Sequence, residues 1–359
     1  MASRSPLRVA FIGVDHPHGA GWRESLALLP DELVLTAIVP EFPGTTTSLE
    51  ERHARLPRYS TVEELLAHGN SQFDAAMVCL PNNAAPAVIT QLARAGKHVL
   101  TEKPAGTNAA AFRAAAQAVL ESGVAFQAGY LWRFDEGANR LREMIADGRL
   151  GKLISIEMTC VTSDVQRRGP GHYLFDSDNS GGGFFNWLGC HYLDLVPYIT
   201  GQSVVAVTAR VGNFGATPTE VEDGGTAIFD LEHHALATLT GGYWLPRWAN
   251  EWQWTLRGSQ RWVRWDPFRA GTGGVLEIHG PQPQFHAMEE TFSLPLDSTP
   301  GYGGRRCVQL LKDWAAAARS EIPDCRNNTT SALAVLDLLD AIYDSSAQGR
   351  KIERRIPAA

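Results

Sequence analysis

The chain has 359 residues, which is enough for about two domains of ordinary size. Hydrophobic residues make up 44% and charged residues 20% of it, values typical of a globular protein rather than of a disordered or fibrous one. The formal net charge of −7 disfavours a nucleic-acid partner, because the phosphate backbone is also negative and no Lys/Arg-rich run compensates for it.

The cysteine pattern and the length of the apolar runs indicate where in the cell the protein is located. The 5 cysteines are far apart and free of CxxC spacing, which predicts buried free thiols rather than disulfides or a zinc knuckle. The apolar run before Gly13 is too short for a signal peptide, and no stretch approaches the roughly 18 apolar residues of a membrane helix. We therefore expect a cytoplasmic protein without membrane association.

The first part of the chain alternates short apolar runs with helical patterns. Strands are predicted at 7–12, 33–39, 75–80, 98–101 and 124–128. Helices are predicted after His18 and at 62–67, 85–95 and 109–121, and Thr61 with Glu64 forms a capping box. This alternation predicts an α/β fold with a Rossmann-type, doubly wound parallel sheet, which we assign to a cofactor domain of residues 1–128.

The pattern changes from Gly129 onward. Helices are predicted at 137–147, 306–320 and 331–345, and longer alternating strands at 153–162, 204–212, 226–231, 235–243 and 251–256. These strands predict a large open, mostly antiparallel sheet with one face covered by helices. We assign this α+β domain to residues 129–359.

The loop after the first strand departs from the usual dinucleotide pattern. It reads Gly13-Val14-Asp15-His16-Pro17-His18-Gly19, where GxGxxG would let backbone amides approach a pyrophosphate. Only the first glycine is in register, and a carboxylate at Asp15 would repel the pyrophosphate unless its side chain turns away to cap the helix. From the spacing alone, a cofactor loop and an ordinary turn remain equal alternatives.

Glu41 follows the second strand, where an acid can bind the adenosine ribose hydroxyls and favour NAD over NADP. An exposed loop carboxylate is the alternative. His16 and His18 could be read as two metal ligands, but Pro17 keeps them from facing one way along a helix and no third ligand is near in sequence. We therefore expect no bound metal.

Two further motifs carry candidate catalytic groups. Lys103 lies just beyond a predicted parallel strand, where the ligands of nucleotide folds bind, although a solvated surface lysine is the alternative. After a triple glycine, Trp187, His191 and Asp194 stand at i, i+4 and i+7, on one face of a predicted helix. Histidine titrates near neutral pH and so suits acid/base work, although a structural histidine is the alternative. A lysine in one domain and a histidine in the next predict a site between the two.

The order of these motifs resembles the Gfo/Idh/MocA oxidoreductases, which include glucose-fructose oxidoreductase and inositol dehydrogenase. The motifs are Pro81-Asn82, GKHVLTEKP at 96–104, Gly129-Tyr130-x-x-Arg133-Phe134, GRLGKLISI from Gly148, and GGG-x-x-x-x-x-G-x-H-x-x-D from Gly181. The resemblance covers nearly the whole chain. It implies NAD(P)-dependent oxidation of a sugar or cyclitol hydroxyl, and a C-terminal sheet that forms a homodimer or homotetramer.

The resemblance also implies roles for residues. Lys103 would contact the reacting hydroxyl and the nicotinamide ribose, and His191 would accept the proton. The residues that would line the cofactor are Gly13, Asp15, His16, His18, Glu41, Pro81, Asn82 and Glu102 as well as Lys103. The residues that would contact a carbohydrate-like substrate are Tyr130, Arg133, His172, Trp187 and Asp194.

One departure from the family leaves the activity open. The family helix usually carries an aspartate four residues before the histidine, and here that residue is Trp187. An indole instead offers a stacking surface for a sugar ring or an aglycone. The main hypothesis is an NAD-preferring dehydrogenase of a sugar, cyclitol or glycoside. The alternatives are an NAD-retaining enzyme that cleaves glycosides by oxidation and elimination, and a non-catalytic ligand sensor of the same fold.

Overall fold

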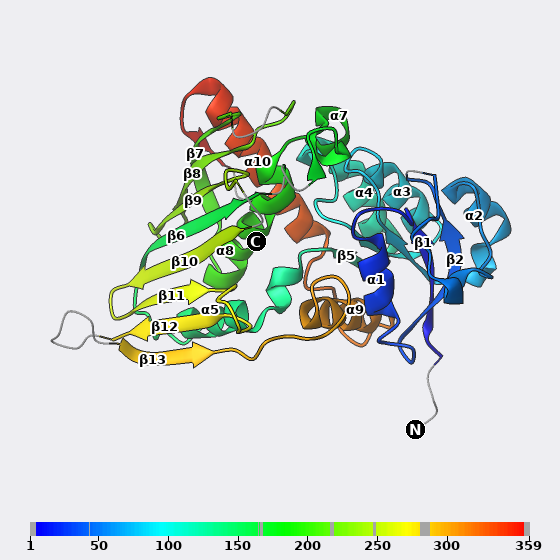
Figure 1. The fold of residues 1–359 in the computed structure, drawn as a ribbon, viewed down its shortest axis with the longest axis horizontal. Coiled ribbons are helices and arrows are strands. Elements are labelled where there is room, and N and C mark those ends of the chain that lie inside the picture. Colours follow the sequence, from blue (N-terminus) through cyan, green and yellow to red (C-terminus); the bar gives the residue numbers. More distant parts are fainter. Residues whose placement is uncertain are drawn as a thin grey trace. The chain divides into compact units, whose positions relative to one another are not determined.

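A computed structural model describes residues 5–42, 44–163, 165, 168–215, 219–246, 249–280 and 288–354 (Figure 1). The chain divides into two compact units, Met1–Phe134 with Ser298–Leu336, and Asp135–Asp297 with Asp337–Ala359. The sequence analysis placed the boundary after residue 128 and gave the whole C-terminal part to the second domain. Ser298–Leu336 instead groups with the first unit, because Cys307, Leu310 and Trp314 pack into its hydrophobic core.

The first unit is built on a five-stranded sheet in the order β2-β1-β3-β4-β5. The strands are β1 (Leu7–Ile12), β2 (Leu33–Val39), β3 (Ala75–Val78), β4 (His98–Thr101) and β5 (Phe126–Ala128). All four pairings are parallel, and β3 is buried along its whole length, as expected for a sheet covered on both faces. The predicted doubly wound parallel sheet is confirmed.

Helices of the first unit begin and end where local sequence signals place them. They are α1 (Gly19–Leu26), η1 (Glu51–His53), α2 (Val62–His68), η2 (Asn70–Gln72), α3 (Ala85–Arg94), α4 (Ala109–Ser122), η3 (Leu131–Phe134) and α9 (Arg305–Ala318). The Thr61 side chain caps α2 by accepting the N–H of Glu64 at 3.2 Å, and the Glu64 carboxylate accepts the N–H of Ser60 at 2.6 Å. Gly123 ends α4 at φ +63°, a conformation that glycine adopts without strain.

The second unit is built on a nine-stranded sheet in the order β13-β12-β11-β10-β6-β9-β8-β7-β14. Its strands are β6 (Leu153–Thr162), β7 (Val204–Gly212), β8 (Gly224–Leu231), β9 (Leu236–Gly242), β10 (Asn250–Gly258), β11 (Trp262–Asp266), β12 (Val275–His279), β13 (Met288–Ser293) and β14 (Ile352–Glu353). Among these pairings only β6 with β9 is parallel. The mostly antiparallel sheet is therefore confirmed, with four strands (β11 to β14) that the sequence analysis did not find.

The helices α5 (Glu136–Ala146), α8 (Cys190–Thr200) and the C-terminal part of α10 (Thr329–Gln348) lie along one face of this sheet (Figure 1). The unit also contains the short helical segments η4 (Tyr173–Phe175), α7 (Ser177–Ser180) and η5 (Phe185–Gly189). Tyr192 of α8 stacks on Trp254 of β10 with ring centroids 5.1 Å apart. Ile228 of β8 and Glu157 of β6 are instead exposed.

All 5 cysteines are buried, and none of them is joined in a disulfide. Among the described residues, none of the helices has both the length and the apolar composition needed to cross a lipid bilayer.

Candidate functional site

Three strand ends of the first unit meet at one edge of its sheet. Ile12 of β1 pairs with Val78 of β3, and Val78 pairs with Thr101 of β4. The residues that follow these ends are Gly13 after β1, Pro81 and Asn82 after β3, and Glu102 and Lys103 after β4. Because the carboxyl ends of parallel strands form the ligand edge of such sheets, the sheet brings these sequence-predicted residues to the expected edge.

Gly13 is required by its surroundings. Its φ is +84°, its N–H donates to the carbonyl of Val39 at 2.9 Å, and a Cβ here would overlap the carbonyl oxygen of Cys79. Only glycine therefore lets the chain turn this closely over the strand ends.

Asp15 turns away from the helix but does not cap it. Its carboxylate accepts the N–H of Thr47 at 2.8 Å and of Ser48 at 2.7 Å, and the hydroxyls of Thr45 and Thr47 donate to it as well. Burial alone would raise the pKa of Asp15, but these hydrogen bonds hold it well below the usual range of an aspartate. The carboxylate therefore anchors the loop that follows β2 and does not cap α1.

Glu102 is the centre of a buried hydrogen-bond network. Its Oε1 accepts the indole N–H of Trp22 at 2.5 Å and lies 2.9 Å from Nδ1 of His18, and its Oε2 accepts the backbone N–H of Lys103 at 3.1 Å. The imidazole of His18 stacks on Tyr302 with ring centroids 4.0 Å apart. Burial would raise the pKa of Glu102, but the charge and hydrogen bond of His18 outweigh it and hold that pKa well below its usual range. The sequence analysis missed Trp22 and Tyr302, whose only signal was an aromatic side chain.

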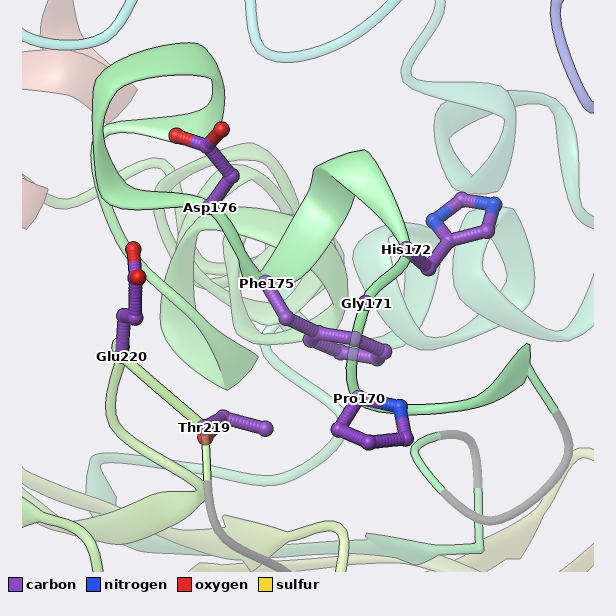
Figure 2. Close-up of a pocket in the computed structure, with 7 residues that line it drawn as sticks. All are labelled: Pro170, Gly171, His172, Phe175, Asp176, Thr219 and Glu220. Atoms are coloured by element: carbon purple, nitrogen blue, oxygen red, sulfur yellow. The ribbon is translucent and has the colours of Figure 1, made fainter.

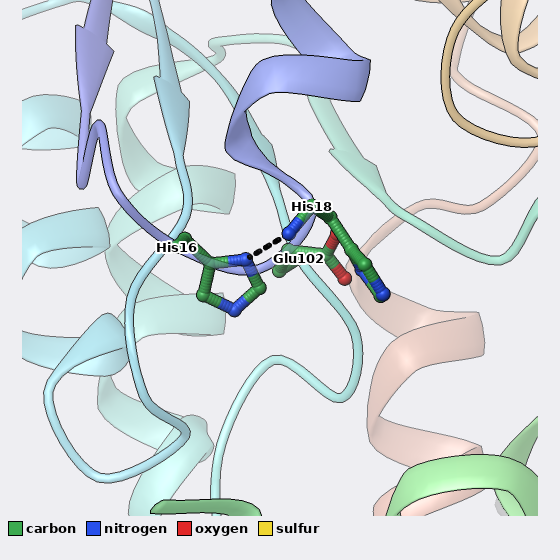
Figure 3. Close-up of side chains that lie close together, drawn as sticks. All are labelled: His16, His18 and Glu102. Atoms are coloured by element: carbon green, nitrogen blue, oxygen red, sulfur yellow. Dashed lines mark hydrogen bonds and ion pairs between the residues drawn. The ribbon is translucent and has the colours of Figure 1, made fainter. Parts of the chain in front are cut away.

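His16, His18 and Glu102 lie close together at the loop before α1 (Figure 3). One possible ligand atom of each residue lies within 4.8 Å of those of the other two. Glu102 is therefore a third candidate metal ligand, near in space although distant in sequence. However, the Nδ1 of His16 accepts the N–H of His18 at 3.2 Å, and Glu102 already serves the donors named above. A bound cation would compete with these hydrogen bonds and would be repelled by the ammonium of Lys103. That this site holds no metal stays a prediction.

The other predicted residues of the first unit differ in their surroundings. Lys103 is 2% exposed, which contradicts a solvated surface lysine. Tyr130 is fully buried, and Arg133 donates to the carbonyl of Arg326 at 2.8 Å, so their contact with substrate stays a prediction. Much of Glu41 is exposed, yet partial burial of its carboxyl and the charge of Glu63 raise its pKa. Its bond to a ribose also stays a prediction.

In the second unit, the segment after the triple glycine is not a regular α-helix. Phe185–Gly189 forms a π-helical turn, and α8 begins only at Cys190. Trp187 and His191 therefore do not follow the α-helical spacing assumed from the sequence, which is a correction. Both side chains are 5% exposed, Asp194 is fully buried, and the guanidinium of Arg168 lies 5.6 Å from the centre of the Trp187 ring. Turns of this kind recur at functional sites.

A pocket of about 440 Å³ opens in the second unit (Figure 2). It is lined by Pro170, Gly171, His172, Phe175, Asp176, Thr219 and Glu220. Figure 2 shows the side chain of Phe175 pointing toward the backbone segment that carries Pro170 and Gly171. This volume suits a small ligand such as a monosaccharide. His172 thus lines a pocket of the right size, although its contact with substrate stays a prediction, as does the sharing of one site by Lys103 and His191.

Comparison with protein families gives two adjacent matches. Residues 7–130 match the model described as an oxidoreductase family with an NAD-binding Rossmann fold, and residues 138–264 match the GFO/IDH/MocA C-terminal domain. Together they cover more than half of the chain. The expectation of an NAD-binding Rossmann domain is thereby confirmed.

The chain is also similar to several characterised proteins. Inositol 2-dehydrogenase of Rhizobium meliloti is 29% identical over 175 residues, which are 49% of this chain and 50% of that protein. Myo-inositol 2-dehydrogenase of Thermotoga maritima is 26% identical over 243 residues, 64% of this chain and 70% of that one. The chain therefore matches the first of these relatives over only half of its length.

Solved structures share the fold over nearly the whole chain. Levoglucosan dehydrogenase in complex with NADH and levoglucosan superposes with a TM-score of 0.84 at 18% identity, covering 99% of this chain and 100% of that one. GenD2 from gentamicin A biosynthesis, in complex with NAD, superposes with a TM-score of 0.80 at 23% identity, covering 99% and 98%. At these identities the likeness establishes the fold alone.

Proposed function

Because the chain belongs to the Gfo/Idh/MocA family of oxidoreductases, we propose that it is an NAD-dependent dehydrogenase of a secondary hydroxyl, or the matching ketone, on a sugar, cyclitol or glycoside. The observation that carries the proposal is the burial of Lys103 at the ligand edge of the Rossmann sheet. Burying an ammonium group disfavours its charged form and costs free energy, and such groups concentrate where chemistry is done.

The loop after β1 fits the cofactor. Gly13 gives the close turn, and the bonds of Asp15 to residues 45–48 carry its negative charge away from the helix N-terminus. The start of α1 would then hold the diphosphate, because the N-terminal end of a helix favours a negative charge, while His18 beside it is bound to Glu102 and stacks on Tyr302. When bound, NAD supplies the acceptor for a hydride.

The proposal gives each catalytic group one task. The ammonium of Lys103 donates a hydrogen bond to the substrate oxygen, and the carboxylate of Glu102 fixes the backbone of Lys103 for this role. The imidazole of His191 accepts the hydroxyl proton. Trp187 and Phe175 offer flat apolar surfaces to a sugar ring.

The substrate class rests on the relatives. Their names specify inositols and levoglucosan, which are polyhydroxylated rings. Trp187 in place of the family aspartate favours a second candidate, in which a bulkier glycoside is oxidised, loses its aglycone and regenerates NAD without net NADH. We also propose a homodimer or homotetramer formed through the exposed face of the nine-stranded sheet, and a cytoplasmic location that suits the free thiols.

The first test is cofactor content. The purified protein is denatured, NAD(H) and NADP(H) are assayed in the supernatant, and the cofactor-free protein is titrated with each by calorimetry. We expect copurified NAD or tighter binding of NAD than of NADP. Failure to bind either at millimolar concentration would refute both enzyme hypotheses and leave the ligand sensor.

The second test is Lys103→Met, assayed with a panel of inositols, anhydrosugars and glycosides. We expect turnover to be lost while the affinity for NAD stays within about threefold, because the substitution removes the ammonium that acts on the substrate oxygen. Lys312→Met, at an exposed position of α9, is the matched control. Undiminished turnover of Lys103→Met would remove this lysine from the mechanism.

A further inference from the structure

Two of the three glycines before the π-helical turn, Gly182 and Gly183, are explained by residues from other parts of the sequence, Tyr343 and Glu222. A Cβ on Gly183 would overlap the backbone carbonyl of Glu222, and a Cβ on Gly182 would overlap the hydroxyl of Tyr343. Gly183 and Gly182 therefore allow Glu222 and Tyr343 to approach this turn closely.

Glu222 binds three successive backbone N–H groups of the turn. Its carboxylate accepts the N–H of Gly183 at 2.6 Å and of Phe185 at 3.0 Å, and its carbonyl accepts the N–H of Phe184 at 3.2 Å. The first N–H groups of a helix have no partner within the helix, and they favour a negative charge. One residue thus satisfies the start of the helical segment, in a way that a local N-cap side chain does not.

The carboxylate is itself held in place. The hydroxyl of Tyr343 on α10 donates to its Oε1 at 2.8 Å. Burial raises the pKa of Glu222, although the hydrogen bonds to its carboxylate act in the opposite direction. A half-buried carboxylate that accepts hydrogen bonds from Gly183, Phe185 and Tyr343 is the arrangement expected of an anchor.

This anchor stands at the start of the segment that carries Trp187 and His191. A π-helical turn is rare and here forms a single turn directly before α8, so its register is set by contacts from outside, such as those of Glu222. A change at the start of the turn would rotate every side chain that follows it. We propose that Glu222 is a positioning residue for His191, fixing the register of the π-helical turn and with it the direction of the imidazole. The catalytic meaning of this proposal rests on the proposed function.

The test compares Glu222→Gln with Glu232→Gln, whose side chain is exposed in the hairpin after β8. Glutamine keeps the size of the side chain but turns an amide N–H₂ toward one of the backbone N–H groups. We expect Glu222→Gln to lower kcat by 10- to 100-fold, since a misplacement of about 1 Å costs on the order of 100-fold. The KM for NAD should stay within about twofold, and Glu232→Gln should behave as the wild type.

A second readout needs no turnover. In protein labelled at the imidazole carbons, the signal of His191 is identified by its loss in His191→Gln and followed in a pH titration. We expect this signal and its titration midpoint to move in Glu222→Gln and not in Glu232→Gln. If Glu222→Gln does not fold, Tyr343→Phe, which removes one donor, should move the same signal by a smaller amount.

The outcomes separate the two proposals. A folded Glu222→Gln or Tyr343→Phe with an unmoved His191 signal overturns the positioning role. If the His191 signal moves in Glu222→Gln but the wild type oxidises none of the substrates, the positioning role is supported and the proposed function is refuted.

Discussion

Asp15→Asn is the substitution that most directly tests how the loop after β1 works. The carboxylate accepts hydrogen bonds from the backbone of Thr47 and Ser48 and from the hydroxyls of Thr45 and Thr47. Three of these bonds go to Oδ2 and one goes to Oδ1. Asparagine keeps the three bonds if its oxygen takes the Oδ2 position, but its N–H₂ group then faces the N–H of Ser48. At about 1 kcal/mol net for each bond, reduced where solvent can replace it, we expect the free energy of unfolding to fall by about 1–2 kcal/mol.

The pH dependence of this loss follows from the pKa of Asp15. The hydrogen bonds lower this pKa in the folded state relative to the unfolded chain, so they contribute stability above the unfolded pKa of about 4 and lose it as the pH falls toward the folded pKa. The difference between wild type and variant should therefore be constant from pH 7 to about pH 5 and shrink below about pH 4. Urea titrations measure it, with Asp31→Asn at an exposed position as the control. A difference that grows on acidification would refute the assigned hydrogen bonds.

The same variant decides which way Asp15 acts on the cofactor. If its carboxylate anchors the loop after β2, asparagine loosens that loop and weakens NAD binding by about five- to tenfold, which corresponds to about 1–1.4 kcal/mol. If the carboxylate instead faced the diphosphate, its removal would relieve repulsion and tighten binding. Calorimetric titration with NAD distinguishes the two by sign, and tighter binding would refute the reasoning.

Two further substitutions test the local packing. Gly183→Ala should lower the free energy of unfolding by about 3 kcal/mol, because the new methyl group overlaps the carbonyl of Glu222. The control Gly171→Ala, which has open space around it, should change this free energy by less than about 0.5 kcal/mol. Equal urea midpoints for the two variants would contradict this expectation. Thr61→Ala should cost about 1 kcal/mol by removing the cap of α2, and thermal unfolding without a fall in Tm would show that the cap contributes nothing.

The regular part of the fold follows from local pattern. β1, β2, β6 and β7 begin and end at the residues predicted from apolar runs and the turn residues beside them. β11, β12 and β13 escaped prediction because they are short strands at one edge of the sheet that pair with one another, and β14 because it is a two-residue strand that pairs with β7 at the other edge. Trp262 of β11, for example, is exposed to a considerable extent and stacks on His279 of β12, its partner across the ladder. No local pattern in either segment specifies that contact.

Some residues of the candidate site could be predicted from the sequence and others could not. Gly13, Asn82 and Lys103 could be placed because each follows the end of a parallel strand, and strand ends are visible in the sequence. The side chains that form hydrogen bonds with Asp15 and Glu102 could not be predicted, because they lie 30 to 84 residues away along the chain. The π-helical turn is a third case: its register depends on Glu222, 37 residues beyond Phe185. Sequence spacing predicts positions along an element, whereas these contacts are decided by tertiary packing.

Lys103 offers the sharpest distinction between an enzyme and a protein that has lost its chemistry. Its side chain is 2% exposed, and a buried ammonium group costs stability that a sensor would have no reason to keep. If the lysine is catalytic, Lys103→Met should abolish turnover of the folded protein, and the loss of its charge beside the Glu102 carboxylate should also lower the free energy of unfolding. If the lysine is only structural, the free energy of unfolding should fall while the folded variant keeps its turnover. Turnover of this one variant, measured beside its urea unfolding, therefore separates the two.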